Sequence, residues 1–233
     1  LNNCPLCCIK MKSNWESQLK LQIRNRYAQE YKVCNVSVEK IIDSGYPKAL
    51  LKNIPTKLIQ NYHGCGFILD QISLEGSETI LDLGSGAGID SYILANEVMH
   101  GTVISLDLTP SALSNHNKQN IFPLCADFEY IPLANNSIDL IIANASINLA
   151  VSKEKVFGEA HRVLKNNGTL IIRDLIKNKE LPAEVYTDPL SYTTSLGGAI
   201  SQDKILSIIE SAGFGNILLS DHKPFSYLKS VTI

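Results

Sequence analysis

The sequence is poor in the features that mark membrane, nucleic-acid-binding and signal-bearing proteins. No run reaches the roughly 18 uncharged apolar residues of a membrane span, and the first residues do not form a basic region before an apolar signal core. The 21 Lys and Arg residues and the 23 Asp and Glu residues nearly balance, and no basic block argues for a nucleic-acid partner. These absences predict a cytoplasmic globular protein that binds neither membranes nor nucleic acid.

Cysteine is also scarce and unevenly spaced. Six cysteines in 233 residues do not form the regular framework of a disulfide-stapled small domain, so we expect reduced thiols. The N-terminal cluster resembles half of a metal site, but no second Cys or His pair at ligand spacing follows it, and we predict no metal. The cysteines are Cys4, Cys7, Cys8, Cys34, Cys65 and Cys125.

The chain divides into a helical part and an alternating part. Residues 1–76 show no strand alternation, and apolar residues every four positions between 15 and 31 indicate an amphipathic packing helix. From residue 77 to 233, strands and helices take turns, as in an α/β domain. We therefore predict a helical N-terminal extension or cap, 1–76, and a single ligand-binding domain, 77–233. Further helices are predicted at 48–53 and 56–62.

The alternating part predicts a doubly wound, Rossmann-like α/β fold with a seven-stranded, mostly parallel sheet and an antiparallel last strand. Strands are predicted at 79–83, 102–107, 121–125, 137–144, 168–174, 215–220 and 225–232. Helices are predicted at 89–98, 110–119, 152–165 and 201–212.

A glycine-rich turn, 84–88, follows the first strand and opens a helix, which is typical of a nucleotide-binding junction. It lacks the Lys-Ser/Thr pair of a triphosphate loop, and Ile89 stands where a dinucleotide fingerprint has its third glycine. Asp82, inside the strand end, would repel a pyrophosphate but attract an ammonium group. The pattern favours the methionine part of S-adenosylmethionine.

Polar residues end the next three strands. Asp107 is placed to accept from ribose hydroxyls, and Asp127 to accept from the adenine amine while Phe128 covers the ring. Asn144 ends a continuously apolar strand at the same edge of the sheet. Each has another interpretation: Asp127 caps a turn, Asn144 satisfies loop backbone, and Asp107 precedes a helix cap at Thr109. Their shared edge favours a cofactor site.

Several motifs together resemble the class I S-adenosylmethionine-dependent methyltransferases, and most closely the arsenite methyltransferases. The resemblance covers about 62–215 and includes Tyr62–Gly66, Asp107–Thr109, 131–139, 144–149, 159–165 and 196–199. It implies cofactor contacts from Tyr62, Gly64, Asp82, Gly84, Gly86, Asp107, Asp127 and Asn144. The same loops add Ser85, Gly88, Leu108 and Phe128 to the predicted cofactor site.

The sequence departs from the arsenite methyltransferases at two positions. That family has arsenic-binding cysteines where this chain has Ala145 and Ser195, and trivalent arsenic strongly prefers sulfur ligands. Cys34 lies in the N-terminal region where that family has a further cysteine, and Cys65 is close by, but neither fills these two positions. The favoured prediction is a methyltransferase, monomer or homodimer, whose acceptor site is remodelled for another small molecule.

Acceptor contacts are predicted from Arg173, Tyr192 and Ser195. The predicted catalytic residues are Asn148, Asp174 and His63, the last two as general bases, although His63 also reads as a helix-terminal histidine bonded to backbone. Three alternatives stay open: an arsenite methyltransferase that uses other cysteines, a cofactor-binding module without catalysis, and a nicotinamide-dependent dehydrogenase.

Overall fold

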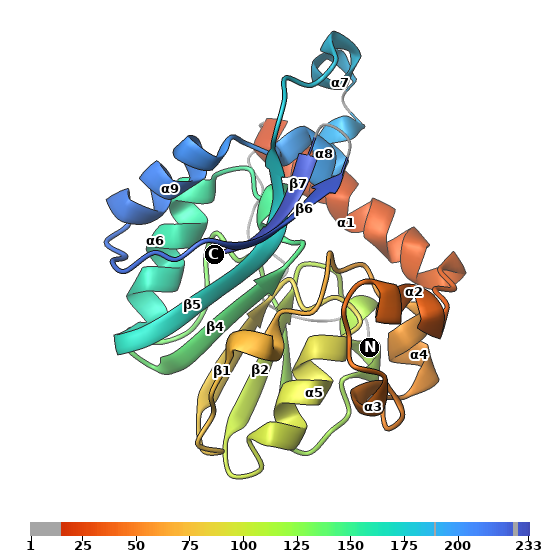
Figure 1. Cartoon of the computed structure of the whole chain (residues 1–233), viewed down its shortest axis with the longest axis vertical. Helices are drawn as coiled ribbons and strands as arrows, with labels where there is room; N and C mark the ends of the chain where they lie inside the picture. Colours follow the sequence, from red (N-terminus) through yellow and green to blue (C-terminus); the bar gives the residue numbers. More distant parts are fainter. Residues whose placement is uncertain (1–14, 189, 226–227) are drawn as a thin grey trace.

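A twisted sheet with strand order β3-β2-β1-β4-β5-β7-β6 runs through the part of the chain that the structure describes (Figure 1). This computed structural model describes residues 15–188, 190–225 and 228–233. Strands β1 to β5 are parallel, and β7 pairs antiparallel with β5 and β6. The strands are β1 (Thr79–Leu83), β2 (Thr102–Asp107), β3 (Ile121–Cys125), β4 (Ile138–Asn144), β5 (Leu164–Lys177), β6 (Ser220–Phe225) and β7 (Leu228–Thr232).

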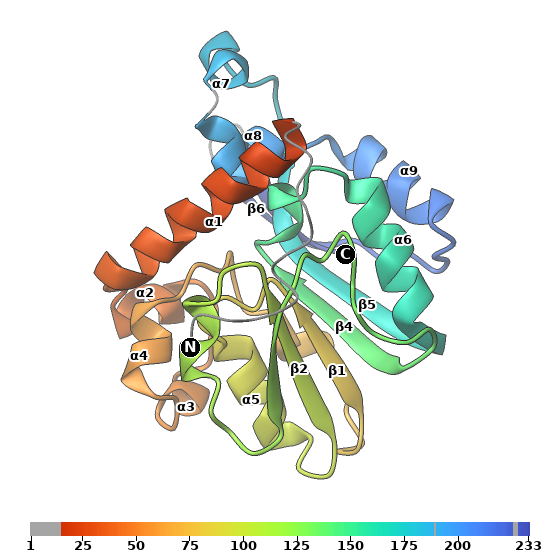
Figure 2. The same ribbon diagram turned by 180° about the vertical axis from the view of Figure 1, so that it is seen from behind.

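Helices cover both faces of the sheet. Helix α5 packs on one face, and α6 and α9 pack on the other (Figures 1 and 2). The α-helices of the described residues are α1 (Trp15–Val33), α2 (Val38–Asp43), α3 (Lys48–Leu51), α4 (Thr56–Gln60), α5 (Ile89–Glu97), α6 (Lys153–Val163), α7 (Ala183–Thr187), α8 (Ser195–Gly198) and α9 (Gln202–Ser211). Short 3-10 turns lie at Leu69–Gln71, Ala112–Asn115, Ile147–Leu149 and Ser191–Thr193. The predicted doubly wound α/β fold is confirmed.

Alternate residues of the central strands fill two separate cores. In β1, Ile80 packs with Leu94 of α5, whereas Leu81 packs with Phe157 of α6, and all three of the residues Ile80, Leu81 and Phe157 are fully buried. Burial on both faces requires an apolar run rather than an alternating one, as these strands show. None of the described helices has both the length and the apolar character needed to cross a membrane.

The N-terminal helices pack against α5 rather than forming a separate layer. Tyr46, Leu51 and Leu58 share one hydrophobic cluster with Ile89 and Ile93 of α5. Helix α1 instead crosses above the carboxyl ends of β1, β2 and β4 (Figure 2), and its only buried residue is Ile23. The predicted boundary at residue 76 remains a prediction.

Four elements differ from their prediction by three residues or more, and one of them is β5, which extends beyond the predicted 168–174 at both ends. The helix expected at 110–119 is a 3-10 turn, Ala112–Asn115, because His116 turns inward and its ring lies under Gly88 of the glycine-rich turn. The strand expected at 215–220 starts only at Ser220, since Ile217 and Leu219 pack on the core from a segment outside the sheet. The final strand begins at Leu228 rather than 225.

Candidate functional site

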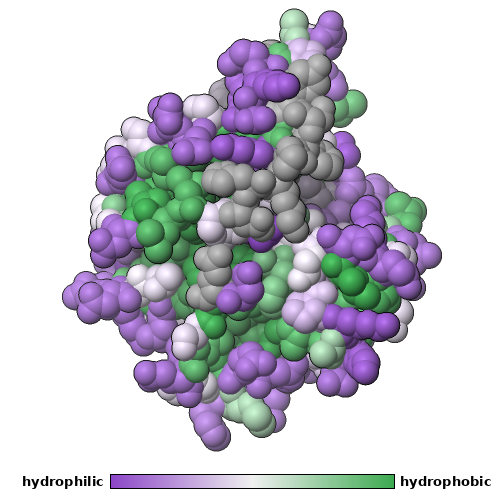
Figure 3. Space-filling view, viewed as in Figure 1, coloured by the Kyte–Doolittle hydropathy of each residue, from purple (hydrophilic) through white to green (hydrophobic). Residues whose placement is uncertain are grey.

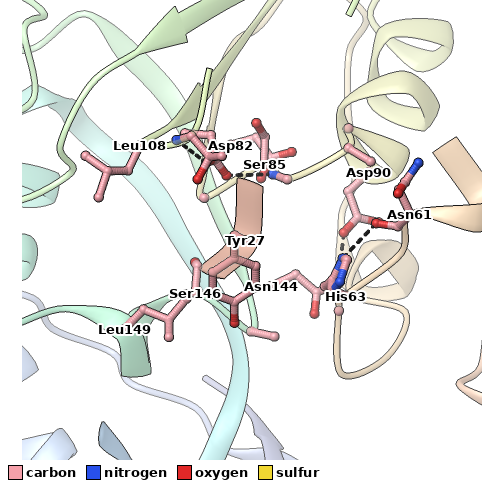
Figure 4. A pocket seen from close by; sticks show the side chains of 18 of the residues that line it. Tyr27, Asn61, His63, Asp82, Ser85, Asp90, Leu108, Asn144, Ser146 and Leu149 are labelled. Atoms are coloured by element: carbon pink, nitrogen blue, oxygen red, sulfur yellow. Dashed lines mark hydrogen bonds between the residues drawn. The ribbon is translucent and has the colours of Figure 1, made fainter. Parts of the chain in front are cut away.

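A cavity lies at the carboxyl ends of the central strands, below α1. Its empty volume, including the open mouth, is about 950 Å³, within the usual range for small-molecule sites. All of the predicted cofactor-binding residues line it, and Figure 4 shows several of them around one space. These are Tyr62, Gly64, Asp82, Gly84, Ser85, Gly86, Gly88, Asp107, Leu108, Asp127, Phe128 and Asn144.

The glycine-rich turn leaves no room for side chains at its start. Gly84 has φ 72°, and a Cβ atom there would lie 2.4 Å from Cβ of Ser146. Gly86 has φ 55°, and its added Cβ would lie 2.8 Å from the hydroxyl of Tyr31 in α1. Both positions therefore need glycine, and the backbone here can approach a ligand closely.

Asp107 holds this turn in place. Its Oδ2 accepts from the Gly86 N–H at 2.9 Å, and its Oδ1 accepts from the Thr109 N–H at 2.7 Å. Burial raises the pKa of Asp107 despite these bonds. The carboxylate lines the cavity, so it could accept a hydrogen bond from a ligand hydroxyl in addition to those from the two backbone N–H groups.

Two further carboxyl groups, Asp82 and Asp90, are buried side by side. Asp82 accepts from the Ser91 hydroxyl at 2.6 Å, and Asp90 accepts from the Tyr46 hydroxyl at 2.6 Å. Burial, and then the charge of Asp90, raise the pKa of Asp82 to about 8, while burial raises that of Asp90 to about 6. A cation in the cavity would stabilise both charged forms. The cavity therefore favours a positively charged ligand.

Asn144 ties the end of β4 to two other segments. Its Nδ2 donates to Asp90 Oδ2 at 2.8 Å (Figure 4) and to the Gly66 carbonyl at 2.9 Å. Its Oδ1 accepts from the Cys65 N–H at 3.0 Å. Asn144 therefore orders the loop backbone, as its alternative interpretation predicted, and also lines the cavity.

Aromatic side chains from α1 close the opposite wall. His63 lies edge-on to Tyr27 and Tyr31, with ring centroids 5.8 and 5.3 Å away. Its Nδ1 hydrogen-bonds with the Asn61 carbonyl at 2.9 Å, and its Nε2 lies 3.2 Å from Glu30 Oε2. The sequence alone does not identify the cavity-lining residues of α1, because their four-residue spacing predicts only an amphipathic packing helix.

Lys20 is a second contribution of α1 that the sequence reasoning missed. Its Nζ lies 2.7 Å from Asp127 Oδ2 and 2.8 Å from Glu129 Oε2. Burial tends to lower the pKa of Lys20, but its bonds to the two carboxylates raise it overall. Asp127 Oδ1 in turn accepts from the Glu129 N–H at 2.9 Å, the turn cap that was its alternative interpretation.

The remaining predicted site residues, His63 apart, do not line this cavity. Asn148 donates from Nδ2 to Asp174 Oδ1 at 2.8 Å, and burial raises the pKa of Asp174 to about 6. Arg173 donates to the Phe67 carbonyl at 3.0 Å. Outside the lining are Asn148, Asp174, Arg173, Tyr192 and Ser195, so their predicted roles gain no support from the cavity. Ala145, with φ 59°, does line it.

A second hollow lies near the C-terminus, where Figure 3 shows hydrophobic residues on the surface. Leu164, Leu170, Phe214 and Ile217 are among its lining residues. It contains none of the predicted site residues. The cavity below α1 is therefore the candidate site.

Comparisons with known proteins identify the family of the chain. Residues 74–213 match the family model described as a methyltransferase domain. The chain is 34% identical over 159 residues to an arsenite methyltransferase of Halobacterium salinarum, covering 65% of this chain and 41% of that protein. It is 31% identical over 198 residues to an arsenite methyltransferase of Aquipseudomonas alcaligenes, and this match covers 78% of this chain and 57% of that protein. The chain thus spans about half the length of the curated relatives it matches.

A solved structure is similar as well. The crystal structure of an arsenic(III) S-adenosylmethionine methyltransferase from Chlamydomonas reinhardtii superposes with a TM-score of 0.69 at 26% identity. The match covers 79% of this chain and 70% of the other. It extends beyond the family-model match, since 79% of 233 residues exceeds the span 74–213.

Proposed function

We propose that this chain, which belongs to the class I S-adenosylmethionine-dependent methyltransferases, transfers the methyl group of that cofactor to a small-molecule acceptor. The observation that supports the proposal most is the cavity below α1, which gathers the glycine-rich turn and the carboxyl groups of Asp82, Asp107 and Asp127 around one space. A cavity of this size has room for a nucleoside cofactor and a small acceptor beside it.

The described residues fit the cofactor. Gly84 and Gly86 form a cradle that a Cβ atom would fill, so the backbone can contact a ligand there. Asn61 Oδ1 and Ser85 Oγ are buried, line the cavity and have no hydrogen-bond partner among the described residues. Buried polar atoms are normally paired, so these two are available to a ligand.

Each part of the cofactor has residues to hold it. Asp107 would accept from the ribose, Asp127 from the adenine amine, and Asp82 and Asn144 would face the methionine end. When bound, the cofactor supplies an electrophilic methyl group on a positively charged sulfur. The chain's own contribution is to orient that group toward the acceptor and to exclude water, with Tyr27 covering the space from α1.

The acceptor side of the cavity supports a substrate that needs no thiolate ligand. Among the described residues, no cysteine lines the cavity, and Ala145 presents a methyl group there. The Cys65 thiol donates to the Arg173 carbonyl at 3.2 Å, and burial raises the pKa of Cys65, so it stays protonated. Trivalent arsenic binds thiolates. We therefore propose an acceptor other than arsenite.

Arsenite methylation is the second candidate, because the relatives matched at 31% and 34% identity are arsenite methyltransferases. Its ligands would have to come from Cys34 or Cys65, neither of which lines the cavity, or from the cluster Cys4, Cys7 and Cys8, which lies outside the described residues.

Calorimetric titration tests the shared part of both candidates. Wild-type protein is titrated with S-adenosylmethionine and with S-adenosylhomocysteine, and micromolar binding of both is expected. The Gly84→Ala variant serves as the comparison, since its added Cβ would collide with Ser146. Absence of binding at millimolar ligand would contradict every methyltransferase function.

Product analysis then separates the candidates. Release of S-adenosylhomocysteine is followed by mass spectrometry across a panel of amine, carboxylate, hydroxyl and thiol acceptors and arsenite, in wild type and in a variant without its six cysteines. Turnover of a non-metalloid acceptor that survives in the cysteine-free variant is expected. Turnover with arsenite alone, lost without cysteines, would establish the second candidate. Tight cofactor binding without any product would instead indicate a non-catalytic module.

A further inference from the structure

Lys20 brings a cation from α1 into the wall that faces the nucleobase end of the cavity. Its Nζ contacts Asp127 Oδ2 at 2.7 Å and Glu129 Oε2 at 2.8 Å, and its side chain is 18% exposed. Lys20, Asp127 and Glu129 all line the cavity. A hydrogen-bond donor and an acceptor therefore lie next to each other on one wall, contributed by different parts of the chain.

Glu129 keeps this cation in place. The Glu129 side chain has no exposed surface beside Lys20, and its Oε1 accepts from the Val151 N–H at 2.8 Å, just before α6. The Oε2 atom has Lys20 as its charged neighbour. Removal of the cation would leave a buried, uncompensated carboxylate, which is strongly unfavourable. Lys20 is thus a fixed part of the wall rather than a mobile surface side chain.

The donors of Lys20 are not all used. An ammonium group carries three N–H donors, and its two described carboxylate contacts leave at least one for a ligand in the cavity. Adenine presents an amine donor with a ring-nitrogen acceptor beside it. Asp127 as acceptor and Lys20 as donor are complementary to that edge. A base with a carbonyl in place of the amine would place its carbonyl oxygen against the Asp127 carboxylate, and two acceptors cannot form a hydrogen bond with each other.

We propose that Lys20 determines nucleobase specificity: Asp127 accepts from the exocyclic amine of adenine while Lys20 donates to the ring nitrogen next to it. The inference rests on the proposed function, because it requires the nucleoside of the cofactor to lie in this cavity. It assigns part of base recognition to α1, so the N-terminal helical segment takes part in binding the cofactor as well as covering it.

The test compares variants in which the fully buried Glu129 carboxylate is never left without its cation. Glu129→Gln keeps Lys20 next to Asp127, and the double variant Lys20→Met, Glu129→Gln removes only the cation relative to it. Lys32→Met is the matched control, because Lys32 lies on the same helix, bonds to Gln29 and does not line the cavity. Thermal unfolding of each variant establishes that it is folded before binding is measured.

Calorimetry gives the affinity for S-adenosylhomocysteine, its inosine analogue and its 1-deaza and 7-deaza analogues, in which a ring nitrogen is CH. In Glu129→Gln and in the Lys32→Met control, one deaza analogue is expected to bind about tenfold more weakly than the parent ligand. In the double variant the parent ligand loses about the same factor, and the difference between parent and deaza ligands disappears.

Two results would overturn the inference while leaving the proposed function intact. One is equal binding of the parent and both deaza ligands by the wild-type protein. The other is a loss in the double variant that is the same for every ligand, since that would show Lys20 to be only an anchor for α1. Failure of the wild-type protein to bind S-adenosylhomocysteine at all would overturn the proposed function and this inference with it.

Discussion

The side-chain amide of Asn144, at the end of β4, donates to Asp90 Oδ2, in the first turn of α5, over 2.8 Å. The same amide nitrogen bonds to the Gly66 carbonyl, so one side chain connects a strand, a helix and the loop that follows α4. Asp90 is 4% exposed and lies beside the cavity. The geometry of the proposed methionine end of the site thus depends in part on this amide.

Replacement of Asn144 by Ala is expected to loosen this junction. The variant leaves Asp90, the Gly66 carbonyl and the Cys65 N–H without the partner that Asn144 supplies. Loss of a buried partner destabilises by about 1–3 kcal/mol, and cofactor affinity is expected to fall by about tenfold or more. Urea unfolding and calorimetry measure the two effects. Asn117→Ala, at an exposed position outside the cavity, is the control, and an equal loss in both variants would contradict the prediction.

Cofactor binding is expected to strengthen with rising pH. The pKa of Asp82 is raised to about 8 and that of Asp90 to about 6, so both groups carry protons at low pH in the free protein. A cationic ligand favours the charged carboxylates, so its binding releases protons, and affinity rises between about pH 6 and 8 by up to about tenfold per unit for one proton.

The charge of the ligand separates this effect from a general effect of pH. S-adenosylmethionine carries a sulfonium charge that S-adenosylhomocysteine lacks, so the slope should be steeper for the former. Titrations at several pH values in two buffers of different ionisation enthalpy give the number of protons released. The Asp82→Asn variant should show a flatter profile, and an unchanged slope in that variant would contradict the assignment to Asp82.

The stability of the ligand-free protein is expected to fall as pH rises through the same range. The pKa of Asp82 is higher in the folded protein than its ordinary value of 3.8, so the folded state binds the proton more tightly than the unfolded state. This contribution is complete below about pH 3.8 and is lost as the pH approaches about 8. Asp82→Asn removes the charge and can still accept from Ser91, so at pH 8 it should be roughly 1–3 kcal/mol more stable than wild type. A stability difference that is the same at pH 5 and pH 8, measured by urea unfolding, would contradict this.

Two glycine-to-alanine variants should have opposite effects. Gly84 has φ 72° and its Cβ would lie 2.4 Å from Ser146 Cβ, so Gly84→Ala is expected to destabilise by about 1–3 kcal/mol and to abolish cofactor binding. Gly158 lies within α6 with nothing within 4 Å of an added Cβ, so Gly158→Ala should stabilise by about 0.5–1 kcal/mol. Thermal unfolding of the pair checks both signs.

The central strands could be predicted closely because their physics is local. Strands β1, β2 and β3 begin and end where the sequence predicts, since apolar runs between polar or glycine-containing ends identify strands of a parallel sheet. The glycine-rich turn was also visible, because its spacing encodes a backbone conformation. The acidic residues at or just after the ends of these strands, Asp82, Asp107 and Asp127, line one cavity, as the shared sheet edge predicts.

The rest of the site depends on contacts between distant segments. The amphipathic spacing of α1 identifies a helix but not its partner, so the pairing of Lys20 with Asp127, 107 residues away, could not be predicted. The sequence predicts that Asn148 and Asp174 reach the acceptor, Asp174 from the end of the fifth strand. The 3-10 turn at Ile147–Leu149 instead brings Asn148 next to Asp174. The two side chains hydrogen-bond with each other, and neither lines the cavity.

Introducing a thiol at Ala145 provides a direct test of the acceptor side of the cavity. Ala145 lines the cavity and already has φ 59°, so Ala145→Cys in a background without the six native cysteines adds no new Cβ strain. A maleimide reagent should label this thiol in the free protein, and bound S-adenosylhomocysteine should slow the reaction by about tenfold or more, because ligand contacts exclude the reagent. Ser195→Cys in the same background is the matched control, since Ser195 is partly exposed and does not line the cavity; its labelling should be insensitive to the ligand. If both thiols are protected alike, or neither is, the bound cofactor does not occupy the space beside Ala145, and the acceptor site has to be sought near α8 instead.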